Sequence, residues 1–237
     1  MKIMLDENLE LHQELNSKLF DKDNFLREDV RDHLIDIAEV FIEDLKENSI
    51  PLKVRDYWLV GSNASYNYTD KSDIDIHIIA DIDSIDVDKN LLTLLYNYAK
   101  SSFNKNHNIK VKGKEVEVYI EGDGATSVSN GIYSLKKNKW IKFPKKIDVE
   151  VVNIEDEPLY KSLYKDYLNI KTKEDIESLI NKLYEIRQEG LASEGEFGVR
   201  NLIFKEFRIR EYLQDLKDRL IEIEDKELSL EGLHLWN

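Results

Sequence analysis

The spacing of apolar residues in this 237-residue chain changes near residue 150. Before that point, short runs alternate apolar and polar residues, most clearly where the apolar positions are Ile74, Ile76, Ile78 and Ala80. Beyond it, apolar residues recur at steps of three and four, the spacing of an amphipathic helix. Because strands and helices pack into different layers, we expect an α/β (α+β) core with a mixed sheet at residues 1–150 and a helical C-terminal domain at residues 151–237.

Within the expected core, the pattern predicts two helices and several short strands. An apolar face from Val30 to Leu45 indicates a helix at 27–46, and residues 88–103 carry Leu91, Leu92, Leu95, Tyr98 and Ala99 at helical spacing. Two hairpins are expected, one turning at Lys112-Gly113-Lys114 and one at Lys136-Lys137-Asn138. The predicted strands are 52–60, 73–80, 108–111, 115–121, 131–134 and 140–143.

In the C-terminal part, the spacing of apolar residues predicts three helices, at 158–170, 172–188 and 197–223. Thr172 followed by Asp175 resembles a capping box, which marks a helix start, and Gly190 lies where a helix stop is expected. The last and longest helix would place its apolar side chains on one face, at Leu202, Ile209, Leu213, Leu216, Leu220 and Ile223.

Composition excludes several classes of protein. With 41% hydrophobic residues the chain can form a core, so it is not of the disordered class. Asp plus Glu number 48 against 34 Lys plus Arg, and a net charge of −14 argues against long duplex nucleic acid as a partner. The absence of Cys excludes disulfides and thiolate metal sites. No signal-peptide pattern or membrane-length apolar run occurs, so we expect a cytoplasmic protein without a membrane partner.

The segment with the most chemical information joins a Gly-Ser turn to a pair of aspartates. Gly61 and Ser62 end the first predicted strand, and Asp73 and Asp75 begin the second. Carboxylates at i and i+2 of a strand project from one face, with Cα atoms about 6–7 Å apart. Oxygen ligands of this kind suit Mg²⁺, and a glycine turn leading into a short helix can direct backbone N–H groups at phosphate.

These residues resemble the signature of the DNA polymerase beta-like nucleotidyltransferase superfamily, over about residues 54–121. The resemblance implies that Gly61 and Ser62 contact the triphosphate of a nucleotide, and that Asp73 and Asp75 bind two Mg²⁺ ions, with Mn²⁺ as a possible substitute. It also implies a third catalytic carboxylate on a later strand. Glu117, within Val116-Glu117-Val118, fits best, while Glu115 and Glu121 share its strand face and stay open as alternatives.

Other polar residues have both a functional and a structural interpretation. Ser65 could donate to phosphate or cap a helical turn, and His77 could reach a nucleotide or form a hydrogen bond within the strand. Tyr133 and Trp140 could stack on a base, although core packing is the safer interpretation. Two basic groups could meet a substrate or belong to solvated, salt-bridged faces: Lys136, Lys137 and Lys139, and Arg200, Lys205 and Arg208.

The predicted function is therefore transfer of a nucleoside monophosphate from an NTP, such as ATP, to an acceptor hydroxyl, with release of pyrophosphate by a two-metal mechanism. The catalytic and metal-binding residues would be Asp73, Asp75 and Glu117, and the nucleotide-binding residues Gly61, Ser62 and Ser65. The acceptor is expected to be a small molecule, a protein or a short single-stranded end. The alternative is a non-catalytic nucleotide-binding or antitoxin-like interaction protein of the same fold.

Overall fold

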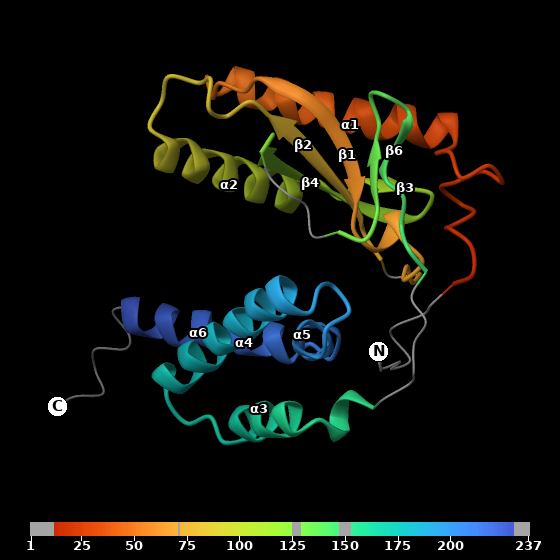
Figure 1. Cartoon of the computed structure of the whole chain (residues 1–237). Helices are drawn as coiled ribbons and strands as arrows, with labels where there is room; N and C mark the ends of the chain where they lie inside the picture. Colours follow the sequence, from red (N-terminus) through yellow and green to blue (C-terminus); the bar gives the residue numbers. More distant parts are fainter. Residues whose placement is uncertain (1–11, 71, 125–128, 147–152, 230–237) are drawn as a thin grey trace. The chain divides into compact units, whose positions relative to one another are not determined.

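The computed structural model describes residues 12–70, 72–124, 129–146 and 153–229 (Figure 1). The chain forms two compact units: residues 12–146 belong to one and residues 153–229 to the other. We describe each unit by itself. No helix among the described residues is long and apolar enough to cross a membrane.

The first unit contains a six-stranded mixed sheet with the strand order β3-β4-β2-β1-β5-β6. Its strands are β1 (Val54–Val60), β2 (Ile74–Ala80), β3 (Lys110–Val111), β4 (Lys114–Gly122), β5 (Ile132–Ser134) and β6 (Lys139–Lys142). Only β2 and β4 pair in parallel; the other neighbours are antiparallel. The expected mixed α+β architecture is confirmed.

Two helices cover one face of this sheet, α1 (Glu28–Glu47) and α2 (Lys89–Asn106). The alternation predicted for the second strand is confirmed, because Ile74, Ile76 and Ile78 are fully buried in a core that includes residues of both helices. The rings of Phe41 in α1 and Phe103 in α2 meet edge to face at 5.0 Å within that core. The opposite face of β2 and β4 therefore carries the intervening polar residues.

Both predicted hairpins are present. Val111 pairs with Lys114, so the first turn contains only Lys112 and Gly113 and is one residue shorter than expected. The helix α2 starts one residue later than predicted, since Asp88 is its cap and accepts a hydrogen bond from the N–H of Leu91. Its buried face consists of Leu92, Tyr96, Ala99 and Phe103, and Leu91 and Tyr98 are exposed.

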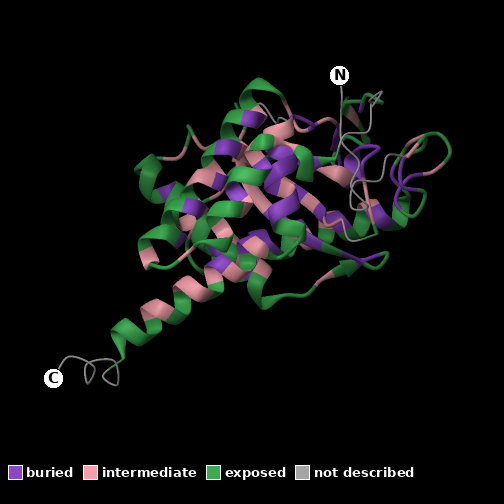
Figure 2. Cartoon of the chain, turned by 90° about the horizontal axis from the view of Figure 1, so that it is seen from below, coloured by how far each residue is buried: buried purple, intermediate pink, exposed green. Residues whose placement is uncertain are grey.

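The second unit consists of helices, with α3 (Pro158–Leu168), α4 (Lys173–Ser193), α5 (Val199–Ile209) and α6 (Tyr212–Leu228) after a short 3₁₀ turn, η2 (Ile154–Asp156). The capping box at Thr172 and Asp175 is confirmed, with both reciprocal hydrogen bonds present. Buried residues recur at helical spacing along α4, at Ile176, Leu179, Leu183 and Ile186. The last turns of α6, next to the end marked C, are mainly exposed (Figure 2).

The prediction that α4 stops at Gly190 is wrong. The helix continues to Ser193, and Gly195, with φ +80°, follows it in the left-handed conformation typical of a helix end. Gly190 instead allows close packing, because a Cβ atom added there would lie 2.7 Å from the Cβ of Arg200 in α5. A glycine in a helical sequence can mark a helix end or a close contact between helices. Gly190 has the second role, because it allows α4 and α5 to approach each other.

The prediction of one helix over 197–223 is also wrong. Glu211 has φ +63°, a left-handed conformation in which a right-handed helix cannot continue, so the segment divides into α5 and α6. The break places Tyr212 against Phe207, with ring centroids 5.7 Å apart. It also lets Arg210 bind both Glu206 and Glu155.

Candidate functional site

The register of β2 and β4 places two of the predicted carboxylates next to each other. Asp75 lies opposite Glu117 in this parallel pair. Neighbouring strands are about 4.8 Å apart, and partners in register project from the same face of the sheet. Both side chains therefore belong to the face that α1 and α2 leave uncovered.

Antiparallel pairing brings the glycine turn to the same end of β2. Val60, the last residue of β1, lies opposite Asp75, so the chain leaves β1 beside the point where β2 begins. Gly61 follows with φ +74° and ψ −162°, and a 3₁₀ helix spans Ser62–Ala64. A Cβ atom added to Gly61 would lie 2.2 Å from Oδ2 of Asp75. Only a residue without a side chain fits here, directly against the carboxylate.

Asn63 fixes this turn to the segment that precedes β2. Its side chain is fully buried, and its Nδ2 group donates to the carbonyl oxygens of Ser72, at 3.0 Å, and Asp73, at 2.6 Å. Its Oδ1 atom accepts a hydrogen bond from Asn16 at 3.0 Å. Because these bonds join the turn to the residue before the strand, Asn63 positions Asp73 relative to Gly61. Sequence reasoning missed this role, although an Asn directly after Gly-Ser at a strand end was a visible signal.

Tyr119 is a second residue that sequence reasoning missed. It lies two positions after Glu117 on the same face of β4, and its hydroxyl donates a hydrogen bond to the Glu117 carboxylate. Burial raises its pKa well above the ordinary tyrosine value, and so do that hydrogen bond and the negative charges of Glu117, Asp75 and Asp73. The phenol thus stays protonated and acts as a donor to Glu117.

The alternatives for the third carboxylate have partners elsewhere. Glu115 is exposed and forms an ion pair with Lys110 at 3.3 Å. Glu121 lies 3.0 Å from Nδ1 of His77, and the hydrogen bond from His77 lowers the pKa of Glu121. Of the three glutamates, Glu117 is the one whose partner in the strand register is Asp75. The contact with Glu121 on the neighbouring strand is the structural kind of interaction expected for His77, within the sheet.

The structure does not bring Ser65 to this surface. Its side chain is fully buried, and its hydroxyl accepts a hydrogen bond from Nδ2 of Asn130 at 2.7 Å. Ser62, by contrast, begins the 3₁₀ helix beside Gly61 and is partly exposed. The N–H of Gly61 donates to the Ser129 hydroxyl at 3.1 Å. The first N–H groups of the 3₁₀ helix, at Ser62 and Asn63, have no acceptor within the helix. Of these two residues, Asn63 is fully buried and Ser62 is partly exposed.

The aromatic residues of the second hairpin belong to the core, as the safer interpretation held. Tyr133 is fully buried, and Trp140 stacks on Phe20 with ring centroids 5.3 Å apart. The basic residues also have structural partners. Lys137 lies 3.4 Å from Asp56, and Lys136 lies over the ring of Tyr57 at 4.4 Å.

Two of the three basic residues singled out in the C-terminal part also have acidic partners. Arg200 pairs with Glu194 at 2.7 Å. Lys205 is 3.6 Å from Glu196, and burial lowers its pKa. Arg208 is exposed, and so is Lys139 of the second hairpin in the first unit. These contacts fit the interpretation of a salt-bridged helix face for Arg200 and Lys205.

The donor atoms at the Asp75–Glu117 pair are the carboxylate oxygens that hard divalent cations prefer. Nevertheless, within residues 12–70, 72–124, 129–146 and 153–229, no three His, Asp or Glu side chains are grouped closely enough to hold a metal ion. The donor type fits Mg²⁺, and the pair would offer such an ion two ligands. A third would have to approach when the ion binds.

No family model, curated protein or solved structure matches this chain.

Proposed function

We propose that this chain is a nucleotidyltransferase that moves a nucleoside monophosphate from an NTP to an acceptor hydroxyl and releases pyrophosphate. One observation carries the proposal: Asp75 and Glu117 are register partners on parallel strands, with the Gly61 turn directly against the carboxylate of Asp75. In this proposal, carboxylate ligands for a cation would lie next to a turn whose backbone N–H can donate a hydrogen bond to phosphate. We further propose that the reaction takes place in the cytoplasm, where NTPs are available.

In this proposal, each residue has a distinct task. Asp73, Asp75 and Glu117 would hold the Mg²⁺ ions, or Mn²⁺ in their place. The Ser62 hydroxyl and the Ser62 N–H group would bind the β and γ phosphates. The bound ions would lower the pKa of the acceptor hydroxyl and neutralise charge on the triphosphate.

The proton balance of the transfer assigns a role to Glu117. The acceptor oxygen forms a bond to the α phosphorus, and the bond from that phosphorus to the pyrophosphate oxygen breaks. The hydroxyl proton has to leave, and the Glu117 carboxylate can accept it. Tyr119 donates to this carboxylate and would hold it in one orientation.

A second candidate function also has support from one observation. Because the described residues do not contain a group of three metal-binding side chains, a protein of the same fold that binds nucleotide without turnover, or an antitoxin-like interaction protein, fits that arrangement. The two functions differ in a measurable product, pyrophosphate.

The test combines binding with turnover. Thermal melting with each of the four NTPs, with and without Mg²⁺ or Mn²⁺, should show metal-dependent stabilisation, which reaches a few kcal/mol when ligand is in large excess over its Kd. Labelled NTPs are then incubated with small metabolites, protein extract or total RNA to find the labelled fraction. Stabilisation without any pyrophosphate release would favour the non-catalytic protein.

Matched variants assign the effect to the site. Asp75→Asn, Asp73→Asn and Glu117→Gln should abolish transfer with little loss of stability, since each keeps its size and loses the charge that binds Mg²⁺. The controls are Asp83→Asn, an exposed aspartate beyond β2, and Glu115→Gln on the same strand as Glu117. Near-normal turnover in Asp75→Asn would place the metal site elsewhere.

A further inference from the structure

The second hairpin of the first unit carries an excess of positive charge. Residues 136–146, which include β6, contain six lysines and no acidic residue, in a chain whose net charge is −14. We call residues 136–146 the basic strip. All six lysines are exposed: Lys136, Lys137, Lys139, Lys142, Lys145 and Lys146. Because β6 is the last strand in the order of the sheet, the strip runs along one of its edges (Figure 1).

Most of this charge has no carboxylate beside it. Lys137 lies 3.4 Å from Asp56, which is the one ion pair that the strip forms within the described parts of the chain. The other ammonium groups of the strip that have a partner contact neutral groups, such as the carbonyl oxygen of Ser129, which accepts a hydrogen bond from Lys142 at 2.6 Å. Neutral partners do not cancel a charge, so the strip remains strongly positive.

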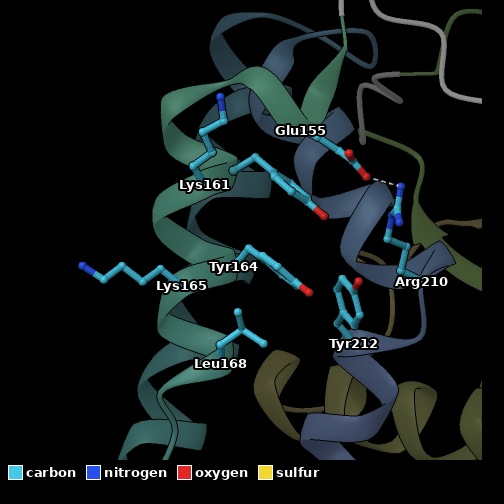
Figure 3. Close-up of a pocket in the computed structure, with 8 residues that line it drawn as sticks. Glu155, Lys161, Tyr164, Lys165, Leu168, Arg210 and Tyr212 are labelled. Carbon is cyan, nitrogen blue, oxygen red and sulfur yellow. Dashed lines mark hydrogen bonds and ion pairs between the residues drawn. The ribbon is translucent and has the colours of Figure 1, made fainter.

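The cations around the hollow among η2, α3 and the junction of α5 with α6 differ in this respect. Arg210 binds Glu155, as Figure 3 shows, and also the buried Glu206. Lys161 lies 3.4 Å from Asp156. These charges are neutralised where they stand, so the hollow offers an anion much less attraction than the basic strip does.

The C-terminal end of the basic strip is tied to the glycine turn of the candidate site. The Ser129 hydroxyl accepts a hydrogen bond from the N–H of Gly61 at 3.1 Å, while the carbonyl oxygen of the same serine accepts the bond from the strip given above. The side chain of Asn130 donates to the hydroxyl of Ser65 at 2.7 Å and to the carbonyl oxygen of Lys145 at 2.9 Å. The strip thus leads from the hairpin tip to the proposed phosphate-binding turn.

The basic strip also exposes two large apolar side chains. Ile141 is 46% exposed and Phe143 is 47% exposed. The ring of Phe143 meets Trp140 edge to face at 5.1 Å, and it has no other ring contact within the described residues. A nucleic-acid base can stack on such a ring while the lysines bind phosphates. The carboxylates of an acidic protein segment would use the lysines alone, since the face of an aromatic ring is electronegative.

We infer that the basic strip binds single-stranded nucleic acid, with phosphates along its lysines and a base against Phe143. A single strand can turn its bases toward an aromatic side chain, whereas a duplex keeps them stacked inside. RNA and DNA strands present the same two groups. In the transfer proposed above, the 3′ hydroxyl of such a strand is the acceptor. That role rests on the proposed function, but the binding itself does not.

The first test measures the salt dependence of binding. A fluorescent single strand of about 12 nucleotides, as RNA and as DNA, is titrated with the full chain carrying Asp75→Asn in EDTA, so that metal-dependent binding and turnover do not contribute. With three to five phosphate contacts, the association constant should fall by about 20- to 130-fold between about 50 and 200 mM salt. If neither strand binds at about 50 mM salt and about 1 mM protein, the inference is wrong.

Lysine variants assign the binding to the basic strip. The double variant Lys139→Gln with Lys145→Gln should reduce the slope of log K against log salt by about 1.4, since each contact with a single strand contributes about 0.7. Lys105→Gln is the matched control, because Lys105 is an exposed lysine of α2 outside the strip, and it should leave the slope unchanged. Equal slopes for the wild type and the double variant would place the strand elsewhere and overturn the assignment.

Aromatic substitution separates a nucleic acid from an acidic protein. Phe143→Leu should weaken binding of the strand by about 5- to 150-fold, the range that corresponds to one lost base stack, and should not affect an abasic strand of the same length. Thermal melting checks that Phe143→Leu is folded, and the lysine variant decides the question if it is not. If a glutamate peptide of equal charge competes as well as the strand and Phe143→Leu affects neither, the partner is an acidic protein and the inference fails.

A turnover assay with the wild-type chain distinguishes this inference from the proposed function. The same strands are incubated with labelled NTPs and Mg²⁺. Label at the 3′ end that is lost in the double lysine variant supports both. Binding to the strip without any labelled product supports the inference and counts against the proposed function. Labelling of a small metabolite, without binding of either strand, supports the proposed function and overturns the inference.

Discussion

Replacing Gly61 with alanine tests the arrangement of the glycine turn and Asp75. The backbone of Gly61, with φ +74° and ψ −162°, lies in a region that essentially only glycine occupies, and another residue there costs on the order of 1–3 kcal/mol. The added methyl group would also lie 2.2 Å from Oδ2 and 3.2 Å from Cγ of Asp75. No real Cβ atom approaches that closely, so Asp75 would have to move. We expect Gly61→Ala to lower the free energy of unfolding by at least about 2 kcal/mol, from strain and displacement together.

Gly195 provides the matched control. It has a similar φ of +80°, but a Cβ atom added there meets nothing within 4 Å. Gly195→Ala therefore reports the cost of positive φ without a collision, which is about 1–2 kcal/mol. Urea unfolding of both variants gives the difference between them. The excess at Gly61 combines the contact with Asp75 and the additional strain of its backbone conformation.

A double mutant separates the contact from the backbone strain. Removing the carboxylate with Asp75→Ala should relieve the collision, so Gly61→Ala should cost less in that background, by about 1 kcal/mol. Metal-dependent NTP binding by Gly61→Ala should fall at the same time, since Asp75 is displaced. If Gly61→Ala and Gly195→Ala cost the same and Asp75→Ala changes neither, the described approach of Gly61 to Asp75 is refuted.

Four other outcomes are expected. Ser62→Ala should weaken NTP binding by about 1.5–3 kcal/mol, the worth of one hydrogen bond to a charged group, as measured by calorimetry. Gly190→Val should destabilise the chain in urea unfolding by about 1–3 kcal/mol, because its side chain would meet Arg200 where α4 and α5 pack closely. Hydrogen bonds from the N–H groups of Lys171 and Thr172, just before α4, lower the pKa of Asp175. Its contribution to stability is therefore present above about pH 4 and is lost as the pH falls below that value, and Asp175→Asn should flatten this part of the stability profile. With a net charge of −14, the chain should bind a 20-base-pair duplex only weakly at near-physiological salt, and submicromolar affinity that falls steeply with added salt would contradict this.

The sequence was most informative where local pattern and tertiary packing agree. The alternation around Asp75 predicted both the strand and the face that carries the carboxylate, because one face of β2 is completely buried. The pairing of Asp75 with Glu117 required the register of β2 against β4, and no local pattern encodes which residue lies opposite which.

The failures occurred where tertiary contacts decide the outcome. Gly190 was predicted to end a helix because glycine follows many helices, yet its role is to allow α5 to pack closely against α4. The break at Glu211 occurs at a residue without any local stop signal and is accompanied by the contacts of Arg210 and Tyr212. Asn63 and Tyr119 act by holding other site residues, so a search for residues that bind metal or phosphate passed over them.

The parallel pairing of β2 with β4 affects the order in which this chain can assemble. Asp75 and Glu117 are separated by 42 positions, so they meet only after the crossover through α2 has closed. The hairpin of β3 and β4 turns on two residues and can form within microseconds, whereas a distant parallel pairing has to overcome the entropy of closing a long loop. The pair of carboxylates thus comes together after the β3–β4 hairpin, and its formation would report that the crossover between β2 and β4 has closed.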